Sequence, residues 1–483
     1  MSAPLILGTN SIKDTGFSVD NSVRLDGTDD HFSRTLTQAG TSNKAFTFSC
    51  WIKRSKRNTD VPRLMHMGGS SASPTHYFRI AFRDDGSGAL QQYHEANGGG
   101  FQLTTNRLFR DESAWYHIVV AVNSAATELI DRQKIYVNGV QETSMSSSTG
   151  MSYNENLGFN DSGDVIYLFR KQQDSDHFPG YACEVAFIDG QQLTPTSFGE
   201  FDSDTPSIWK PIDFKDDVTF GTNGFYLEFK DSSALGADTS GNGNNFNYNF
   251  GATNQSTDTC TNNFATLNSL TTWTGGSSHV LSEGNTIITI GGTTEKRAVL
   301  GTIGFTKGKW YWEVKYVSKT GDNYSTIGIT DANTDERNGY GEYDYAYRGE
   351  YSSGGLKVNN STFTSYGDTW TVGDIISVAV DCDNNYIYFA KNGTYQNSGD
   401  PTSGSSGTGA AFNIVDASNT DGGQYLPCIG KQDSADPVFN FNFGNPTFSI
   451  SSGNSDARGH GNFSYAPPSG YFSLCSSNLA EFG

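Results

Sequence analysis

The chain has 483 residues, with 32 basic against 52 acidic side chains and a formal net charge of −20. This acidity argues against nonspecific nucleic-acid binding, which needs Lys and Arg to neutralise phosphates. The basic cluster KRSKR at 53–57 fits a solvated strand end or turn. No apolar run approaches the ~18 residues of a membrane-spanning helix, and the opening MSAPLILGTN lacks the features of a secretory signal. We therefore expect no nucleic-acid partner and no membrane insertion.

Residues alternate between apolar and polar along most of the first half, which is typical of half-buried β-strands. The expected strands lie at 46–52, 76–82, 115–123, 132–140, 165–170 and 181–189. Asn138-Gly139 is a type I′ hairpin signal. One short helix is expected at 193–201, with Thr194 as its cap and Pro195 at its first position.

A Gly/Asn/Ser/Thr-rich stretch at 231–264 interrupts this pattern and favours a linker or an extended crossover between domains, preceded by a strand at 224–229. Alternation then returns, and the expected strands lie at 285–290, 308–317, 325–330, 374–383, 385–393 and 439–444. Asn392-Gly393 is a second hairpin signal, which echoes the first. This echo suggests two related sandwiches but is too short to establish a duplication.

The six cysteines form no CxxC pair and have no histidine at metal-ligand spacing. Strand parity places Cys50 with Phe46 and Phe48, and Cys183 with Val185 and Phe187. Cys382 is aligned in the same way with the apolar residues of 375–382, so all three are interpreted as small core residues. This use of cysteine points to folding in a reducing compartment. A Cys50–Cys183 disulfide stays open as an alternative.

Several stretches of the first half resemble the concanavalin A-like, laminin-G-like fold: NSVRLDGTDDHFSRT, FTFSCWIKRS, WYHIVVAVN, KIYVNGVQETS and YACEVAFIDGQQLTPTSFGEF. In the second half, GKWYWEVKY, GDIISVAVDCDNNYIYFAKNG and FNFNFG are similar to the strands and the Asn-Gly turn of a SPRY domain. Both halves look like the versions found in marine bacteriophage virion and tail-fibre proteins.

The resemblance implies an all-β chain of two antiparallel β-sandwiches, concanavalin A-like and SPRY-like, in jelly-roll arrangement. We expect a laminin-G-like sandwich at 1–205, a Gly/Asn-rich linker with one strand at 206–264 and a SPRY-like sandwich at 265–483.

Motifs typical of enzymes are weak in this sequence. A glycoside hydrolase needs two carboxylates flanking the scissile bond, and EYDYAYRGE at 342–350 is the closest run. Glu342 and Asp344 share a face there, but Tyr347 stands where a third carboxylate is needed. Neither a nucleophile elbow nor a P-loop is present. We expect no enzyme, and a polysaccharide depolymerase on a jelly-roll fold is the alternative.

No cofactor is expected, although calcium is open as a ligand. Laminin-G-like sandwiches often hold Ca²⁺ through loop Asp and Asn oxygens, and the candidates here are DGTDD at 26–30 and DNN at 383–385. Asp and Asn in turns also make Asx hydrogen bonds without any ion.

The tyrosine-rich stretch 338–355 is the most suggestive candidate surface, because the resemblance places it among the binding loops of a SPRY domain. Tyrosine supplies rigid amphipathic area for sugar or protein contacts. The candidate ligand-binding residues are Tyr340, Tyr343, Tyr345, Tyr347, Tyr351 and Trp370. The alternative is that Tyr343, Tyr345 and Tyr347 share one strand face and pack in the core, with Trp370 packed likewise.

Trp51 is a second aromatic with two interpretations, because it lies on the face opposite Phe46 and Phe48. It would either line a lectin groove or pack against the other domain.

These observations predict a non-enzymatic bacteriophage virion protein, such as a tail fibre, appendage or capsid decoration, assembled in a host cytoplasm. The expected partners are other virion proteins, further copies of the chain and a host-surface glycan.

Overall fold

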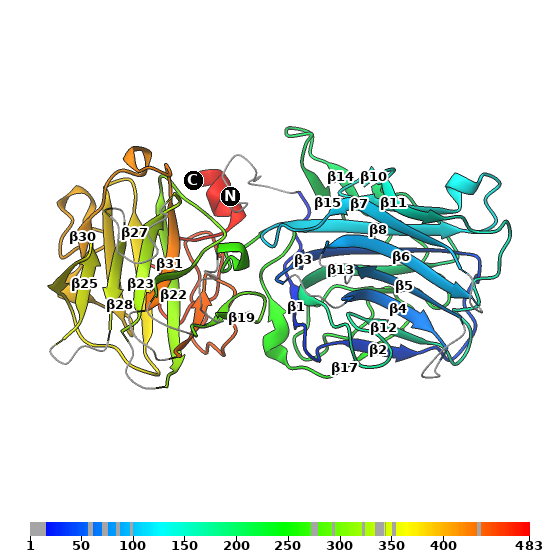
Figure 1. Ribbon diagram of the computed structural model, residues 1–483, viewed down its shortest axis with the longest axis horizontal. Helices are drawn as coiled ribbons and strands as arrows, with labels where there is room; N and C mark the ends of the chain where they lie inside the picture. Colours follow the sequence, from blue (N-terminus) through cyan, green and yellow to red (C-terminus); the bar gives the residue numbers. More distant parts are fainter. Residues whose placement is uncertain are drawn as a thin grey trace. The chain divides into compact units, whose positions relative to one another are not determined.

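The structure is a computed structural model that divides by its internal contacts into two compact units, Thr15–Thr261 and Asn262–Gly483 (Figure 1). It describes residues 16–56, 61–69, 76–83, 87–96, 100–271, 279–291, 295–320, 324–333, 342, 344–349, 354–431 and 436–483. Both units are built almost entirely of antiparallel strands, so the expected all-β fold is confirmed.

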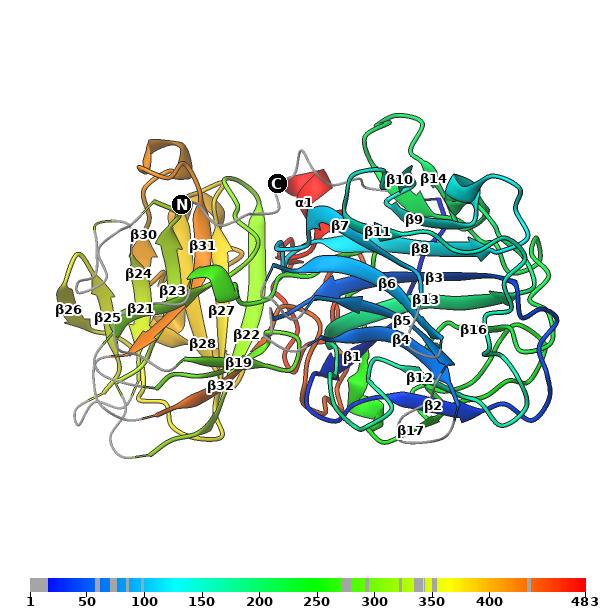
Figure 2. The ribbon, with the colours of Figure 1, turned by 45° about the vertical axis from the view of Figure 1, so that its right-hand side comes forward.

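Two large sheets form the sandwich of the first unit, and a separate two-stranded sheet accompanies them (Figures 1 and 2). One, called here the covered sheet, contains in spatial order β10 (Val140–Gln141), β9 (Gln133–Val137), β8 (Trp115–Asn123), β3 (Ala45–Arg54), β13 (Pro179–Asp189), β1 (Ser22–Asp26) and β18 (Gln255–Ser256), with β16 (Phe225–Leu227) paired to β13. The other, called here the open sheet, contains β11 (Met145–Thr149), β7 (Gln102–Leu108), β6 (Ala89–Ala96), β5 (His76–Phe82), β4 (Arg63–Gly68), β12 (Val165–Leu168), β2 (Phe32–Thr35) and β17 (Asn247–Tyr248).

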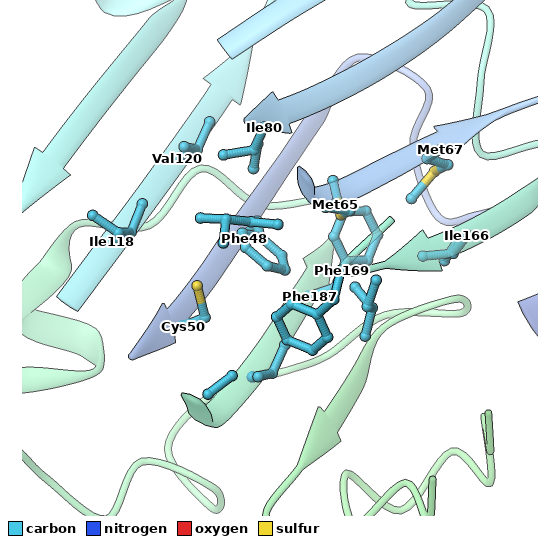
Figure 3. Packing of buried hydrophobic residues seen from close by; sticks show 14 of the residues in the cluster. Phe48, Cys50, Met65, Met67, Ile80, Ile118, Val120, Ile166, Phe169 and Phe187 are labelled. Carbon is cyan, nitrogen blue, oxygen red and sulfur yellow. The ribbon is translucent and has the colours of Figure 1, made fainter. Parts of the chain in front are cut away.

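The core of this unit lies between the two sheets, where alternating side chains of each inner face meet (Figure 3). Phe48 and Ile118 come from the covered sheet, and Met67, Ile80 and Ile166 come from the open sheet. All five are fully buried, which is the burial that stabilises a sandwich.

A β-bulge in β13 corrects the predicted parity of Cys183. Cys183 pairs with Trp51 and Ala186 with Ser49, so two residues of β13 lie opposite one residue of β3. Glu184 takes a left-handed φ of 51° at this bulge. The extra residue turns Cys183 to the outer face, away from the core cluster that holds Cys50. Cys183 Sγ instead lies 3.6 Å from Cys260 Sγ.

Apolar side chains also cover the outer face of the covered sheet. Trp51 packs there with Trp115 and Trp209, and Trp51 stacks on His117 with ring centroids 4.7 Å apart. Trp209 belongs to β15 (Trp209–Pro211), which pairs with β14 (Gly199–Phe201). Trp51 therefore packs within its own unit and does not line a groove.

The expected linker at 206–264 is wrong, because most of it belongs to the first sandwich. β16, β17 and β18 pair with β13, β2 and β1, and Leu235 and Phe246 enter the core between the sheets. The Asp and Asn side chains that suggested a solvated linker instead hold the backbone. Asp238 accepts N–H groups of Tyr226, Ser240 and Asn244.

Two buried carboxylates bind irregular segments to the covered sheet. Asp258 accepts Lys53 Nζ at 2.8 Å and Trp115 Nε1 at 3.0 Å, with both members of the ion pair fully buried. Asp189, at the end of β13, accepts the N–H groups of Thr41 and Asn223 at 2.7 and 3.0 Å. The first compact unit therefore extends to Thr261, well past the predicted boundary at 205.

The second unit has two further sheets (Figure 2). The larger contains β19 (Val280–Ser282), β20 (Ile287–Thr289), β32 (Val438–Asn442), β22 (Lys309–Ser318), β27 (Ile375–Asp381), β28 (Tyr386–Lys391) and β29 (Thr394–Tyr395), with β30 (Phe412–Asn413) on β28 and β33 (Phe472–Ser473) on β22. The smaller contains β21 (Glu295–Leu300), β31 (Tyr425–Lys431), β23 (Thr326–Asp331), β24 (Tyr345–Arg348), β25 (Leu356–Asn359) and β26 (Thr362–Ser365).

Helical structure is scarce in the described residues. The one α-helix among them is α1 (Ser476–Phe482), and the single 3-10 turns are Leu129–Asp131, Pro195–Ser197, Ala252–Asn254, Ser269–Thr271, Gln396–Ser398, Gly404–Ser406 and Ala417–Asn419. The expected helix at 193–201 is thus only one turn, and Thr194 makes no capping hydrogen bond. None of the described helices is long and apolar enough to cross a membrane.

Both predicted Asn-Gly hairpin turns are confirmed. Asn138 and Gly139 have φ values of 47° and 79°, and Asn392 and Gly393 have 48° and 80°, as type I′ turns require. Each asparagine side chain also accepts an N–H of the neighbouring strand, from His117 and from Ile375 respectively.

Glu313 of β22 fastens the C-terminal segment to the second unit. Its Oε1 accepts the N–H of Tyr465 at 2.8 Å and the hydroxyl of Tyr311 at 3.1 Å. Its Oε2 accepts the N–H of Ser464 at 2.9 Å and the side-chain amide of Asn442 at 3.2 Å. Burial raises the pKa of this fully buried carboxyl.

Replacing this acceptor should destabilise the second unit. Glu313→Gln places an NH₂ group where the donors of neighbouring residues need an acceptor. The free energy of unfolding of the second unit should therefore fall by about 2–4 kcal/mol, measured by urea unfolding. Glu200→Gln, which changes an exposed carboxylate in the same chemical way, is the control and should shift stability by less than about 0.5 kcal/mol. Equal effects in the two variants would contradict the anchoring role of Glu313.

Acid should destabilise the first unit through two neutral buried histidines. Burial lowers the pKa of His117 to about 3 and that of His66 to about 3, from 6.5. Trp209 Nε1 donates to His117 Nδ1 at 2.9 Å, so a proton on that nitrogen would face another donor. Glu184 acts in the opposite direction, because burial raises its pKa to about 7.

Below pH 6.5 the unfolded chain binds protons on His66 and His117 that the folded unit does not bind, and burial also lowers the pKa of His31 and His94, whereas the folded unit holds an extra proton on Glu184. The free energy of unfolding should therefore fall by about 1–2 kcal/mol between pH 6.5 and 5, measured by urea unfolding with the two units' transitions fitted separately. His117→Gln removes one of the largest of these contributions, so the dependence should become clearly smaller. A dependence unchanged in that variant would contradict the assignment.

Candidate functional site

The outer face of the open sheet carries a row of large polar and aromatic side chains. Strand register places Tyr167, His66, Arg79, Tyr93 and Gln102 directly opposite one another across β12, β4, β5, β6 and β7. These strands lie side by side in one layer (Figure 1). Because side chains alternate along each strand, a single register aligns all of them on the same face.

The rings of this face contact one another. His66 stacks on Tyr77 with ring centroids 5.1 Å apart, and Tyr77 and Tyr93 are 5.9 Å apart. The guanidinium of Arg79 lies 4.6 Å from the centre of the Tyr93 ring. We call Tyr77, Tyr93, Tyr167, His66 and Arg79 the aromatic face. Each of them except His66 is half-buried, so part of every tyrosine ring is open to solvent.

Local packing explains why these residues point outward. Phe78 and Ile80 of β5 enter the core, so Tyr77 and Arg79 between them face the other way. In β4 a register shift between Arg63 and Met65 brings Met65 and Met67 into the core and leaves His66 outside.

A hydrogen-bonded network fixes the polar end of the aromatic face. Arg79 Nη2 donates to Gln91 Oε1 at 2.8 Å, and Gln91 Nε2 donates to Thr104 Oγ1 at 3.1 Å and to Gln102 Oε1 at 3.2 Å. The Tyr93 hydroxyl donates to Glu95, which raises the pKa of Tyr93 to about 12. These bonds hold the side chains in place before any ligand arrives, which lowers the entropy cost of binding.

Several cationic side chains surround the aromatic face. Burial, together with the charges of Arg63, Arg79 and Lys171, keeps His66 neutral at pH 7. Arg63 Nη2 donates to Asp176 at 3.1 Å, while its buried Nε and Nη1 atoms have no hydrogen-bond partner in the part of the chain that the structure describes. A second guanidinium, that of Arg170, lies 4.6 Å from the centre of the Tyr167 ring. Such a surface suits ring stacking combined with hydrogen bonds to hydroxyl or carboxylate oxygens.

The predicted tyrosine site divides into two groups. Tyr345, Tyr347 and Trp370 are buried in the core of the second unit, where Tyr347 lies 5.5 Å from Phe389 and Trp370 lies 5.6 Å from Tyr316 between ring centroids. These three side chains pack in the core, as the alternative interpretation predicted, because their rings fill the space between the two sheets of the second unit. Tyr340, Tyr343 and Tyr351 lie outside the described residues.

The weak carboxylate pair is not supported as an acid/base site. Asp344 is buried and accepts the hydroxyl of Thr330 at 2.5 Å, whereas Glu342 is exposed. On the aromatic face, Glu95 accepts the Tyr93 hydroxyl and Asp176 accepts Arg63.

The proposed calcium loops form compact turns. Asp26 Oδ1 accepts the N–H of Thr28 at 2.7 Å, and Asp30 Oδ2 accepts the N–H of Asp26 at 3.0 Å and Asn254 Nδ2 at 2.9 Å. Carboxylate oxygens of Asp26, Asp29 and Asp30 lie within 4.8 Å of one another. In the other loop, Asp383 Oδ1 accepts the N–H of Gly308 at 2.8 Å. Internal donors thus account for both turns without an ion.

Sequence reasoning did not single out the aromatic face. The strand at 76–82 was predicted, and its alternation already placed Tyr77 and Arg79 together opposite Phe78. The strands β4, β6 and β7 were not predicted, so the alignment of five side chains in one row was hidden.

Two family matches agree with this architecture. Residues 26–197 match the concanavalin A-like lectin/glucanases superfamily in its laminin G form, and residues 309–445 match the SPRY domain. The chain therefore carries a laminin-G-like, concanavalin A-like domain followed by a SPRY domain.

Individual relatives cover only parts of the chain. Ran-binding protein 9 of Danio rerio is 35% identical over 88 residues, which are 18% of this chain and 14% of that protein. Among solved structures, a SAP-like pentraxin from Limulus polyphemus is 16% identical, with a TM-score of 0.27 over 36% of this chain and 78% of its own. The SPRY domain of human HERC1 is 20% identical, with a TM-score of 0.25 over 34% of this chain and 96% of its own.

Proposed function

We propose that this chain is a non-enzymatic virion structural protein whose first unit binds a host-surface glycan on the aromatic face. The single observation that carries the binding part is the row of Tyr167, His66, Arg79 and Tyr93 across neighbouring strands. Sugar rings present apolar C–H faces and a rim of hydroxyls, so stacked tyrosines flanked by guanidinium groups suit them.

The structural asymmetry of the first unit supports this choice of surface. Trp51, Trp115 and Trp209 close the outer face of the covered sheet, whereas Tyr77, Tyr93 and Tyr167 keep exposed area on the open sheet. Arg79 and Arg170 favour a glycan that bears carboxylate or other anionic groups.

The virion part of the proposal rests on the resemblance of both halves to bacteriophage virion domains. It includes assembly in a host cytoplasm, contacts with other virion proteins and self-association, because virions repeat their parts by symmetry. The net charge of −20 suits a component that stays soluble until assembly.

Variants of the aromatic face should lose glycan affinity. Tyr93→Ala and Tyr167→Ala each remove a half-exposed ring, and Arg79→Met removes the guanidinium while keeping its length. Each should weaken binding about tenfold or more, measured by calorimetry with the best ligand from a glycan array that includes acidic sugars.

Tyr153→Ala is the matched control, because Tyr153 is the most exposed large aromatic of the same unit, at 64%, and lies outside the aromatic face. It should bind like the unmodified chain. Equal losses in all four variants, or no glycan bound by the unmodified chain, would contradict the proposed site. Release of reducing ends from host polysaccharide would instead establish a depolymerase.

Purified particles of the virus that encodes this chain should contain it at a fixed copy number. Mass spectrometry of gradient-purified particles would detect it, and labelled antibodies against the first unit should decorate the particle surface. Light scattering of the isolated chain should give a multiple of 52.4 kDa. If purified particles contain their other structural proteins but not this chain, the virion role is refuted. The glycan-binding result would not be affected.

A further inference from the structure

A second cluster of chemically active side chains lies beside the aromatic face. His31 immediately precedes β2, and Asp174 and His177 belong to the segment 169–178 that connects β12 to β13. One ligand atom from each of these three residues lies within 4.8 Å of the other two. The rings of His31 and His177 are 6.2 Å apart between centroids.

His31 has the hydrogen bond that a metal-binding histidine needs. Its Nδ1 lies 2.7 Å from the carbonyl oxygen of Asp29. A carbonyl only accepts, so Nδ1 carries the proton and the lone pair is on Nε2. In metal sites, a histidine that binds the metal through one ring nitrogen commonly donates its other ring N–H to a backbone carbonyl, which orients the ring.

His177 supplies the second, independent observation. Its side chain is more than nine-tenths buried, and among the described residues its Nε2 atom has no hydrogen-bond partner. That atom lies 3.4 Å from Asp174 Oδ1. Two ligands on one tetrahedral Zn²⁺ stand about 3.4 Å apart, given metal–ligand bonds of about 2.0–2.1 Å.

The connecting segment is held in an unusual conformation. Phe169, Asp174 and Asp176 all have positive φ values between 55° and 67°, a region that L-residues rarely occupy. Two backbone bonds close the turn, from Lys171 N–H to Ser175 at 2.8 Å and from Asp174 N–H to Lys171 at 3.2 Å. Strain of this kind is concentrated at ligand-binding segments, at a cost of about 1–3 kcal/mol per residue.

We propose that His31, Asp174 and His177 form a binding site for a divalent transition-metal ion of the Zn²⁺ class. Two imidazoles and one carboxylate suit zinc, whereas calcium prefers six to eight oxygens. The fourth position is left for water or for an oxygen of a bound ligand. This inference is independent of the proposed glycan binding.

Arg170 is the group that competes with the metal. Its Nη1 atom donates to Asp174 Oδ1 and its guanidinium lies over Tyr167. Asp174 is 67% exposed in its side chain, so this ion pair is weak and easily exchanged. The metal takes the Asp174 oxygen, and Arg170 keeps its position over the tyrosine ring.

Zinc titration tests the site. The full chain, without a histidine tag and dialysed against EDTA, should bind one Zn²⁺ per chain in calorimetry with ZnCl₂. CaCl₂ should neither bind at this site nor displace zinc. CoCl₂ should give the intense visible absorption of a four-coordinate cobalt centre.

Three variants decide the assignment. Asp174→Asn and His31→Gln should each weaken zinc binding at least tenfold, and the exposure of Asp174 makes its variant safe for folding. Arg170→Met removes the competitor without touching a ligand, so it should bind zinc as tightly as the unmodified chain or more tightly. His460→Gln, in the other unit, controls for general histidine affinity and should change nothing.

The proposal is overturned if the unmodified chain shows no saturable zinc binding. It is equally overturned if Asp174→Asn and His31→Gln bind zinc as tightly as the unmodified chain, or if calcium competes with zinc at equal concentration.

Discussion

Buried carboxylates are the interaction on which both units depend. Long irregular segments lie against the sheets, and each buried N–H of such a segment needs an acceptor. Asp189 and Glu313 accept backbone N–H groups of such segments, whereas Asp258 lies in one of them and accepts the side chains of Lys53 and Trp115 from the covered sheet. An apolar side chain at any of these positions would leave several donors without partners, at a cost of about 1–3 kcal/mol each. Acidic residues thus do structural work here that the net charge alone does not reveal.

This anchoring decides which surface of the first unit is left for function. Asp258 accepts Trp115 Nε1 at the outer face of the covered sheet, where Trp51, Trp115 and Trp209 pack together and close that face. The open sheet receives no comparable apolar cover among the described residues, and its outer face keeps polar aromatic side chains. Its order then follows from register, because hydrogen bonding between adjacent strands aligns Tyr167, His66 and Arg79 without any contribution from loops.

The sequence allowed the strands to be predicted better than the functional surface. Alternation located β5 and β8 residue for residue, and both Asn-Gly turns were read correctly. Strand parity placed Cys183 on the wrong face of the sheet, because a β-bulge adds one residue to β13 and no feature of the composition indicates it. Composition gave a wrong prediction of a linker over 206–264, because asparagine is equally common in solvated linkers and in hydrogen-bonded turns. Tyr345 and Tyr347 misled for a related reason, because an aromatic strand face looks the same whether it meets solvent or another sheet.

Arg170 connects the two candidate sites of the first unit. Its guanidinium contacts the ring of Tyr167 on the aromatic face and the carboxylate of Asp174 in the histidine cluster. With Asp174 as its partner, the guanidinium of Arg170 is shared between that exposed carboxylate and the ring of Tyr167. When a cation takes that carboxylate, the same guanidinium is left with the tyrosine ring and with whatever anionic group lies above it. An ion in the cluster would therefore strengthen the attraction of the aromatic face for acidic ligands without moving a strand, because only the partner of one surface arginine changes.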